Sequence, residues 1–390
     1  MKIKQLSTAG LLGCAAITSV HASVTMYGIV DVPIEYITNL ASAPATVNPD
    51  TGVVTNYPGG GRAGIASAGG LSGSQFGFRG VEELGSGLKA LFVLENGFNP
   101  DTGTFQQAGR LFGRQGFVGI ESDQLGKFTL GRQYSALFDM MYHASPMKYS
   151  STYEPIFLQL GPNARADNTI KYTGNFGKFT TEAHYSFGVG VAKLALTSLA
   201  NGGAGETAGH SRDNTAFGVG LMYRSDGFTV SMAYDQWNAA VSTGQPGAAK
   251  KLGISSSYAF GPTKIMAGYR WGSGKSHDNV MLLRDDYFWA GIQHRLNPTL
   301  EVSLGLYYEN VKTLRVRSTA PLTQLPEIWQ VSFNAVYSLS KRTDLYLTTA
   351  YSKNAGLNMD TSANGYAGGF FVAQGHSNQL GTAIGVRHRF

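Results

Sequence analysis

Cysteine is almost absent from this chain of 390 residues, because Cys14 is the only one. A lone cysteine near the start excludes a disulfide framework and a cysteine metal site in the rest of the chain. Charged residues are also scarce, at 14% of the total. After the first 22 residues no stretch reaches the roughly 18 consecutive apolar residues that a membrane helix needs, so any spanning structure must be built from strands.

Motifs for catalysis and cofactor binding are missing as well. No H-E-x-x-H or G-x-S-x-G string occurs, and the histidines after residue 22 never fall within four residues of one another. Gly59, Gly61 and Gly64 fit G-x-G-x-x-G, but we place them in a long loop with no following helix, which argues against phosphate binding. The formal charge of +6 comes from scattered lysines and arginines, which is weak support for a nucleic-acid partner. The sequence therefore predicts no cofactor, no metal, no nucleic acid and no enzyme.

The amino terminus has the pattern of an export signal. Lys2 and Lys4 precede an apolar stretch over residues 6–20, and the small-residue cleavage signal ends at Ala22. Residues 11–14 also resemble the box before a lipidated cysteine, which would make Cys14 the first mature residue. We favour cleavage after Ala22, because the apolar stretch continues past Cys14 and a strand begins at Val24. The interpretation is a signal peptide over 1–22 and one barrel over 23–390.

What is abundant is strand and turn material: glycine (51), tyrosine (20) and phenylalanine (21). Residues 379–390 alternate almost without fault between apolar and small or polar side chains, and the chain ends on Phe390. A chain that stops on such a strand is typical of a barrel closed by its last strand. We predict sixteen strands in an all-β transmembrane antiparallel barrel.

Connections between the predicted strands alternate between short and long, which is typical of bacterial outer-membrane barrels. The seven short turns are expected near residues 83–87, 123–126, 175–177, 225–227, 261–262, 297–298 and 339–341. The eight long loops are expected near residues 38–72, 97–109, 136–166, 189–213, 239–248, 273–285, 311–328 and 355–377. An even strand number places both termini on the short-turn, periplasmic side.

The register follows from the cost of burying charge in lipid. In residues 300–310 the apolar set includes Leu304 and Leu306, whereas Glu301 and Glu309 lie on the other face. Turning the strand over would direct two carboxylates towards lipid, which is unfavourable, so the glutamates face the lumen. A secreted sandwich or solenoid is the alternative without a membrane, but the polar face fits a water-filled interior better.

Short blocks along the whole chain carry a family resemblance. They read VTMYGIVD at 24–31, FGFRG at 76–80, EELG at 82–85, GLKA at 87–90, FGRQ at 112–115, LGRQ at 130–133 and GVRHRF at 385–390. In this order and spacing they resemble the general diffusion porins, the trimeric Gram-negative outer-membrane family, in its betaproteobacterial branch. The resemblance implies a sixteen-stranded barrel, three per assembly, whose third outer loop folds into the lumen.

The loop expected to fold inwards is 136–166, which carries many aromatic and apolar residues. Such a loop can instead be an exposed flap. The resemblance also implies a constriction where acidic groups of the loop face basic groups of the wall. The wall positions of the family's arginine ladder fall at Gln75, Arg114 and Arg165, so Gln75 departs from the pattern and puts strong anion selectivity in doubt.

Further constriction candidates share the parity of these wall positions or lie on the loop. They are Arg79, Lys171, Asp139, Glu154 and Asp167. Each acid can instead cap a helix or pair locally. Replacing Arg114 by a neutral residue is expected to shift ion selectivity towards cations.

The resemblance also suggests partners. Arg132 falls where family members place an arginine at the trimer contact, and Asp101 is a candidate partner across that interface, or the two are an unrelated surface pair. Tyr27 and Phe390 are expected in interfacial aromatic girdles. Phe390 also matches the terminal aromatic read by the barrel assembly machinery, and contacts with lipid and lipopolysaccharide are implied.

The functional prediction is an outer-membrane pore for passive diffusion of ions and small hydrophilic solutes, with weak charge selectivity set at a constriction. A solute-selective channel is the nearest alternative, and it would show saturable, stereoselective transport. An outer-membrane barrel hydrolase is the alternative of a different class, and it would need a serine or aspartate and a histidine at matching strand heights.

Overall fold

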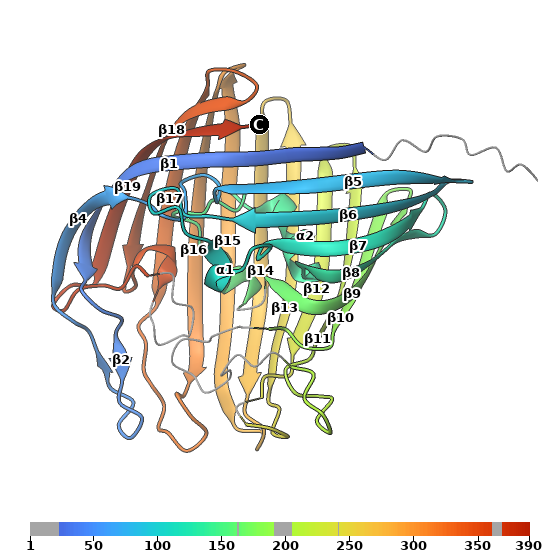
Figure 1. Ribbon diagram of the computed structural model, residues 1–390. Coiled ribbons are helices and arrows are strands. Elements are labelled where there is room, and N and C mark those ends of the chain that lie inside the picture. The colour runs from blue at the N-terminus through green and yellow to red at the C-terminus, as the bar shows by residue number, and fades with distance from the viewer. Residues whose placement is uncertain (1–22, 162–163, 191–204, 241, 361–368) are drawn as a thin grey trace, which may run out of the picture.

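The computed structural model describes residues 23–161, 164–190, 205–240, 242–360 and 369–390. The predicted signal peptide, with Cys14, lies outside these residues. One antiparallel sheet of seventeen strand segments closes on itself (Figure 1). Its first nine segments are β1 (Ser23–Ala41), β4 (Gly59–Ile65), β5 (Gln75–Gly85), β6 (Leu88–Gly97), β7 (Gln115–Ser122), β8 (Gly126–Tyr134), β9 (Arg165–Phe176), β10 (Phe179–Ser186) and β11 (Ala216–Ser225). The other eight are β12 (Phe228–Trp237), β13 (Ala248–Phe260), β14 (Thr263–Lys275), β15 (Met281–Asn297), β16 (Leu300–Leu314), β17 (Ile328–Ser338), β18 (Thr343–Lys353) and β19 (Asn378–Arg389).

Sixteen strands make up the wall, because β4 and β5 together fill one position. Both pair with β1, β5 along residues 23–29 and β4 along residues 34–41. The opposite edge of β1 pairs with β19, which closes the barrel. The backbone of Phe390 exchanges two hydrogen bonds of 3.0 Å with that of Gly28. The predicted sixteen-stranded antiparallel barrel, closed by the terminal strand, is confirmed.

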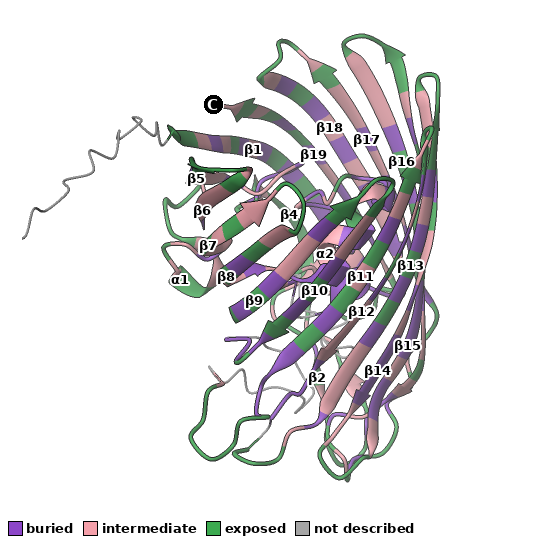
Figure 2. Ribbon diagram, turned by 90° about the vertical axis from the view of Figure 1, so that its right-hand side faces the viewer, coloured by how far each residue is buried: buried purple, intermediate pink, exposed green. Residues whose placement is uncertain are grey.

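The predicted register is also confirmed. In β16, Leu304 and Leu306 are exposed, whereas Ser303, Tyr307 and Glu309 are buried. The same alternation runs along most of the wall (Figure 2). Apolar side chains therefore form the outer face, and polar side chains together with buried aromatics face inwards.

All seven predicted short turns lie between consecutive strands where the sequence placed them. Two of the long loops differ from the prediction. The 38–72 loop contains β4 and a small hairpin of β2 (Thr46–Val47) and β3 (Val54–Thr55), so Gly59, Gly61 and Gly64 lie in a wall strand. Backbone pairing with β1 holds this glycine-rich stretch in the sheet, although it has few side chains that could pack there. The 273–285 loop is only residues 276–280, because β14 and β15 extend further.

In the described residues, helical structure is confined to segments of three to six residues. These are α1 (Gln106–Gly109), α2 (Ala136–Met141), η1 (Tyr142–Ala144), α3 (Ile156–Leu160) and η2 (Leu357–Met359). No helix in the described ranges is long and apolar enough to cross a membrane. The hydrophobic core lies where α2 and α3 meet inner-face side chains such as Trp237, Tyr287 and Trp289. The main apolar packing thus joins residues 136–160, which we call the inward segment, to the wall.

Candidate functional site

The inward segment begins with a capped helical turn that is bound to the wall. The Ser135 hydroxyl accepts a hydrogen bond from the Phe138 amide at 3.3 Å and so caps α2. The Ala136 amide donates to Nδ1 of His184 at 3.2 Å, and the Leu137 amide donates to Asp235 Oδ2 at 3.3 Å. The amides at the start of α2 therefore have partners on β10 and β12.

Further along, the backbone carbonyls of the inward segment accept hydrogen bonds from inner-face side chains. Ser231 donates to Met140 O at 2.7 Å, and the Trp289 indole donates to Ala144 O at 2.8 Å. At the far end, Ser332 donates to Tyr153 O at 2.6 Å. Donors on β12, β15 and β17 thus hold the segment along one side of the barrel interior.

A second connection holds the segment from the opposite side. Residues 66–74, which separate β4 from β5, bind Asp31 of β1 through the amides of Gly70 (3.1 Å) and Ser72 (2.8 Å). The hydroxyls of Ser150 and Thr152 then donate to Gly70 O (2.8 Å) and Gly69 O (2.6 Å). The break in the second wall strand therefore supplies a bridge between β1 and the inward segment.

Between this segment and the wall lies a cavity of about 400 Å³ that we call the eyelet. Residues from both sides contribute to its lining. The wall provides Gln75, Arg114, Tyr134 and Arg165, and the inward segment provides Phe138, Tyr142, Lys148, Tyr149, Glu154 and Phe157. The structure thus brings together four of the eight constriction candidates: Gln75, Arg114, Arg165 and Glu154.

The two eyelet arginines differ in their partners. Arg114 Nε donates to Glu95 Oε1 at 2.7 Å, and its Nη2 donates to the Tyr134 hydroxyl at 3.2 Å. Arg165 donates to the same hydroxyl at 2.9 Å and lies 4.5 Å from the centre of the Tyr134 ring. Within the described part of the chain Arg165 forms no salt bridge. The charge of Arg114 is compensated at contact distance, whereas that of Arg165 is not.

Glu154, the acid that the inward segment contributes to the eyelet, is buried. Its carboxylate accepts hydrogen bonds from the Ser145 hydroxyl (2.7 Å), the Ser150 amide (3.0 Å) and the Tyr307 hydroxyl (3.3 Å). Burial raises the pKa of Glu154 to about 7, and these hydrogen bonds oppose the rise. At neutral pH its charge is therefore only partly present, which weakens any field across the eyelet.

The other acid of the inward segment, Asp139, is engaged elsewhere. Lys171 forms salt bridges with Asp139 and, at 3.0 Å, with Glu182. These three residues line a separate cavity of about 290 Å³ beside β8 and β9. The predicted candidates Lys171 and Asp139 thus meet each other and lie outside the eyelet lining.

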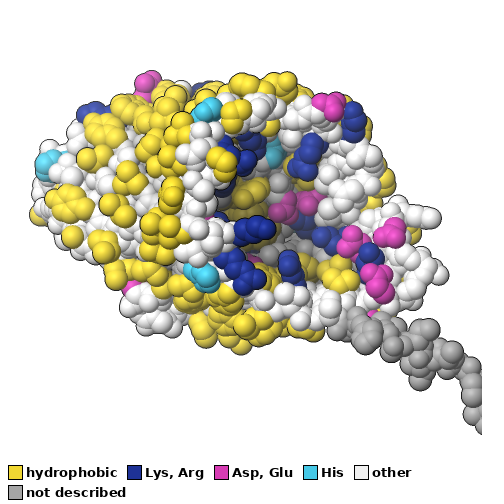
Figure 3. Space-filling model, turned by 90° about the horizontal axis from the view of Figure 1, so that it is seen from above, with side chains coloured by type: hydrophobic (Ala, Val, Ile, Leu, Met, Phe, Trp, Pro, Cys, Tyr) yellow, Lys and Arg dark blue, Asp and Glu magenta, His cyan; other side chains and the backbone are white. Residues whose placement is uncertain are grey.

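Two more candidates also lie away from the eyelet. Arg79 is exposed and sits 5.3 Å from the Tyr27 ring. Asp167 accepts from Arg110 at 2.9 Å and from Arg132 at 2.6 Å, so it forms a three-residue ion cluster at the start of β9. Lysine and arginine side chains gather around the hollow at the end of the barrel where the C-terminus lies (Figure 3).

The residues predicted for assembly contacts have partners within the chain. Arg132 binds Gly113 O at 2.7 Å as well as Asp167, and exposed Asp101 accepts from Ser67 at 2.6 Å. Phe390 is exposed at the end of the wall, as expected of a girdle residue. Tyr27 is not, because its hydroxyl donates to Glu95 Oε2 at 2.9 Å. The girdle prediction for Tyr27 was wrong, since Tyr27 lies on the face that carries Glu95 and Arg114.

Sequence reasoning did not find Glu95 or Tyr134, which connect the charges of the eyelet. Glu95 binds Arg114, Tyr27 and, at 3.4 Å, the Gln75 amide. The signal was present in β6, where a carboxylate near the end of an apolar strand must face the lumen. The aromatic at 134 carried no such signal, because strand tyrosines occur on both faces.

A serine, a histidine and an aspartate do meet at the start of α2, which bears on the hydrolase alternative. His184 Nε2 lies 3.7 Å from Asp235 Oδ1, and Ser135 is adjacent. However, His184 Nδ1 accepts from the Ala136 amide, and the Ser135 hydroxyl caps α2. The arrangement differs from a catalytic triad, in which the histidine would accept the serine proton. These residues position α2.

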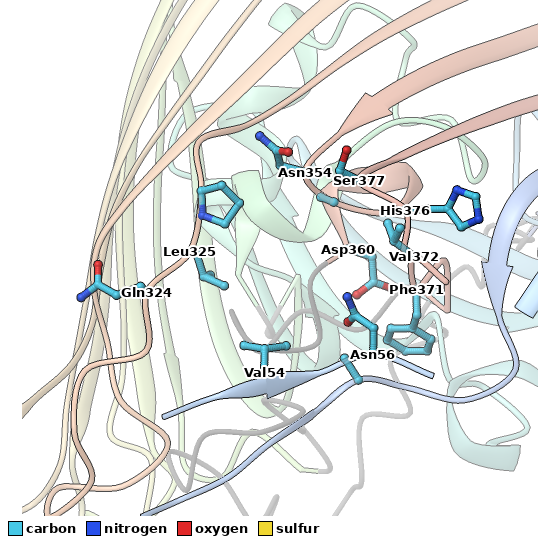
Figure 4. Close-up of a pocket in the computed structure, with 13 residues that line it drawn as sticks. Val54, Asn56, Gln324, Leu325, Asn354, Asp360, Phe371, Val372, His376 and Ser377 are labelled. Carbon is cyan, nitrogen blue, oxygen red and sulfur yellow. The ribbon is translucent and has the colours of Figure 1, made fainter. Parts of the chain in front are cut away.

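The outer connections enclose a smaller cavity of about 210 Å³ (Figure 4). Its lining comes from β3, from residues 324–326 and from the connection between β18 and β19, and includes Val54, Leu325 and Phe371. Asp360 at its edge accepts from the amides of Gly369 (2.7 Å) and Phe370 (3.0 Å). This cavity holds none of the predicted site residues. Among the described residues no group of three or more His, Cys, Asp or Glu side chains is arranged to hold a metal ion.

Comparisons with known proteins agree with this geometry. The sequence profile described as Gram-negative porin matches residues 7–357. The chain is 27% identical to an outer membrane porin protein of Bordetella pertussis over the full length of both. It is also 27% identical to outer membrane porin protein 32 of Delftia acidovorans, over 99% of each.

Solved structures show the same fold. The chain is similar to the anion-selective porin from Comamonas acidovorans, with a TM-score of 0.72 and 24% identity over 95% of this chain and 100% of that one. It is also similar to the trimer form of OmpT from Vibrio cholerae, with a TM-score of 0.60 and 13% identity over 95% of this chain and 99% of that one.

Proposed function

Since the chain belongs to the Gram-negative porin family, we propose that small hydrophilic anions cross its barrel more readily than cations. The protein is an outer-membrane porin, a channel for passive diffusion and not an enzyme. The ion preference is set in the eyelet, where the inward segment narrows the passage.

The carrying observation is the uncompensated charge of Arg165. The nearby acids are neutralised in different ways: Glu95 pairs with Arg114, Asp139 pairs with Lys171, and Glu154 is buried with a raised pKa. The net charge of the side chains that line the eyelet is therefore positive. A fixed positive charge in a narrow, partly desolvated passage favours anions without a binding site deep enough to stop flow. The loss of one arginine of the family ladder at Gln75 keeps the preference weak.

Single-channel recording in a planar bilayer under a salt gradient tests this function. We expect conductance steps that scale with salt, and a reversal potential on the anion-selective side. R165Q should move that potential towards the cation side, whereas R317Q, which removes an exposed outer arginine paired with Asp50, should leave it unchanged. An unchanged reversal potential in R165Q would show that the selectivity is set elsewhere.

We also propose that three copies of the chain associate, on the outer face of β7 and β8. Strand β7 has eight residues and β8 nine, whereas β15 has seventeen. Figure 1 shows that β5 to β8 also lie at a strong tilt. Eight residues at that tilt reach roughly 20 Å, less than the apolar band of about 25 Å that a barrel presents to lipid.

Neighbouring subunits would complete this low wall, since its outer face carries Val118, Ile120 and Leu130. The ion cluster of Arg110, Arg132 and Asp167 lies close by, which supports the expected role of Arg132 at the contact. Asp101 accepts from Ser67, but its side chain is exposed and can also contact a neighbour. The trimer form of OmpT from Vibrio cholerae, which has the same fold, supports association in threes. We further propose that the assembly machinery reads the exposed terminal ring of Phe390.

A further inference from the structure

Two aromatic side chains are unusually accessible in the eyelet. Tyr142 is 50% exposed and Phe157 is 51% exposed, and both line the cavity. Apolar ring surface facing water is unfavourable, and the exposed part of each ring makes no packing contact that would offset the cost. Exposed apolar surface inside a concave site commonly marks the place where a ligand binds.

The aromatic surface continues from the inward segment to the wall. The rings of Tyr142 and Tyr149 lie 5.1 Å apart, those of Tyr149 and Phe138 lie 4.8 Å apart, and Phe138 stacks on Tyr134 at 3.9 Å with an interplanar angle of 10°. The Tyr149 hydroxyl donates to Phe138 O at 3.3 Å, which fixes these two rings relative to each other. The surface is therefore formed in advance of any ligand.

This surface ends at the uncompensated cation of the eyelet. The guanidinium of Arg165 lies over the Tyr134 ring at 4.5 Å. The lining of one cavity thus includes both a positive charge, with no salt-bridge partner in the described ranges, and accessible ring faces. A guanidinium pairs well with a carboxylate, and ring faces stack against another ring.

We propose that the eyelet contains a subsite for flat aromatic carboxylates, of which benzoate is the simplest. Their carboxylate group pairs with Arg165, and their ring packs against Tyr142 and Phe157. A small anion such as acetate lacks the ring, and benzyl alcohol lacks the charge, so each uses only half of the subsite. This inference rests on the proposed function, because the ligand reaches the subsite by entering the pore.

Interruption of the ion current by added solutes tests the subsite. We expect benzoate to produce brief closures of the native pore in planar bilayers, at frequencies that rise with its concentration. Acetate, benzyl alcohol and cyclohexanecarboxylate at equal concentration should produce far fewer. Equal closure frequencies for benzoate and cyclohexanecarboxylate would overturn the proposal, because they would show that the flat ring is not recognised.

Three variants test which residues of the eyelet bind benzoate. Y142L and F157L keep apolar volume but remove a ring, and each should weaken benzoate block roughly twofold to tenfold, in line with the loss of one aromatic contact. R165Q should abolish it. F187L is the matched control, because Phe187 is similarly exposed but lies outside the eyelet lining.

Different results would overturn the subsite and the pore function. Undiminished block in both Y142L and F157L would overturn the subsite while leaving the pore intact. A correctly inserted protein that conducts no ions would overturn the proposed function, and the subsite with it.

Discussion

At the residue scale, Glu95 controls the charge balance of the eyelet. It holds Arg114 by a salt bridge of 2.7 Å and also accepts from Tyr27 and Gln75. The proposed anion preference therefore depends on an acid of the wall as well as on its arginines. The apparent charge of the ladder cannot be counted from its arginines alone.

Replacing Glu95 by glutamine should strengthen anion selectivity, because glutamine can still accept from Arg114 but no longer neutralises it. The reversal potential in a salt gradient should move further towards the anion side. Loss of the charge-assisted hydrogen bond should lower the free energy of unfolding by about 1–3 kcal/mol. E83Q, near the exposed end of β5, is the control and should change neither quantity. A shift of the E95Q potential towards cations would contradict this account.

Glu154 should make the packing of the inward segment depend on pH. Its pKa in the folded protein, about 7, lies above the ordinary value of 4.5. A raised pKa means that the contribution of this group to stability is fully present below pH 4.5 and is lost as pH rises through 7. We expect hydrogen-exchange protection of residues 145–154, corrected for intrinsic rates, to fall over this range in the native protein.

The titration of His143 overlaps that of Glu154, so the native protein must be compared with a variant that lacks the Glu154 carboxylate. Burial, together with Lys264 and Arg224, lowers the pKa of His143 to about 4, so its contribution is lost as pH falls below 6.5 and acts in the opposite sense. The difference between native protein and E154Q isolates the glutamate. If both lose protection equally between pH 4.5 and 8, Glu154 does not govern the packing.

At the element scale, each wall strand has one lipid face and one lumen face, and the two tolerate charge differently. In β16, exposed Leu304 and Leu306 alternate with buried Tyr307 and Glu309. Two of the buried aromatics, Tyr307 and Trp289, bind the inward segment through Glu154 Oε1 (3.3 Å) and Ala144 O (2.8 Å). Tyr307 belongs to β16 and Trp289 to the neighbouring β15, so each of these strands contacts lipid with one face and supports the inward segment with the other.

The substitution L306R should destabilise the barrel by roughly 2–4 kcal/mol, the cost of an arginine on the lipid face near the midplane. Equilibrium unfolding by denaturant in lipid vesicles measures this difference. L125R is the control, because Leu125 lies in the exposed turn between β7 and β8, where the change should cost less than about 0.5 kcal/mol. Similar costs at the two positions would contradict the lipid-facing assignment of Leu306.

At the scale of the whole molecule, the wall is uneven. The long strands β13 to β16 belong to the part of the wall that contacts the inward segment, and the short strands β7 and β8 leave a low wall. The barrel therefore has one side suited to lipid and one suited to another subunit. The proposed oligomer contact and the eyelet lie close together, since Arg132 and Arg165 belong to neighbouring strands.

Tryptophan placed at Val118 should break the proposed trimer, because a bulky ring would separate two packed surfaces. Val118 is 56% exposed in the isolated chain, on the outer face of β7. L304W is the matched control, since a tryptophan on the lipid face of β16 is tolerated. Light scattering of the detergent-solubilised protein should give a monomer for V118W and a trimer for L304W. A V118W trimer would remove β7 from the proposed contact.

The features that could be predicted from the sequence are those that depend on residues close together in the chain. The sixteen strands, the seven short turns and the lipid-facing side of β16 follow from a two-residue period and from local turn chemistry, which the chain carries in adjacent residues. The sequence also marked Arg114, Arg165 and Glu154, which the fold brings into one cavity. The break between β4 and β5 was missed, because the pairing that creates it joins residues far apart.

The sequence by itself determined the alternation, the turns and the strand that ends the chain, because these depend on neighbouring residues. Only the tertiary structure decided which charges remain free. Lys171 meets Asp139 across 32 positions, Asp167 meets Arg110 across 57, and Arg165 meets no acid in the described residues. Such pairings depend on closure of the barrel and on the path of the inward segment, and electrostatic energy depends on distances in space that the order of residues does not contain.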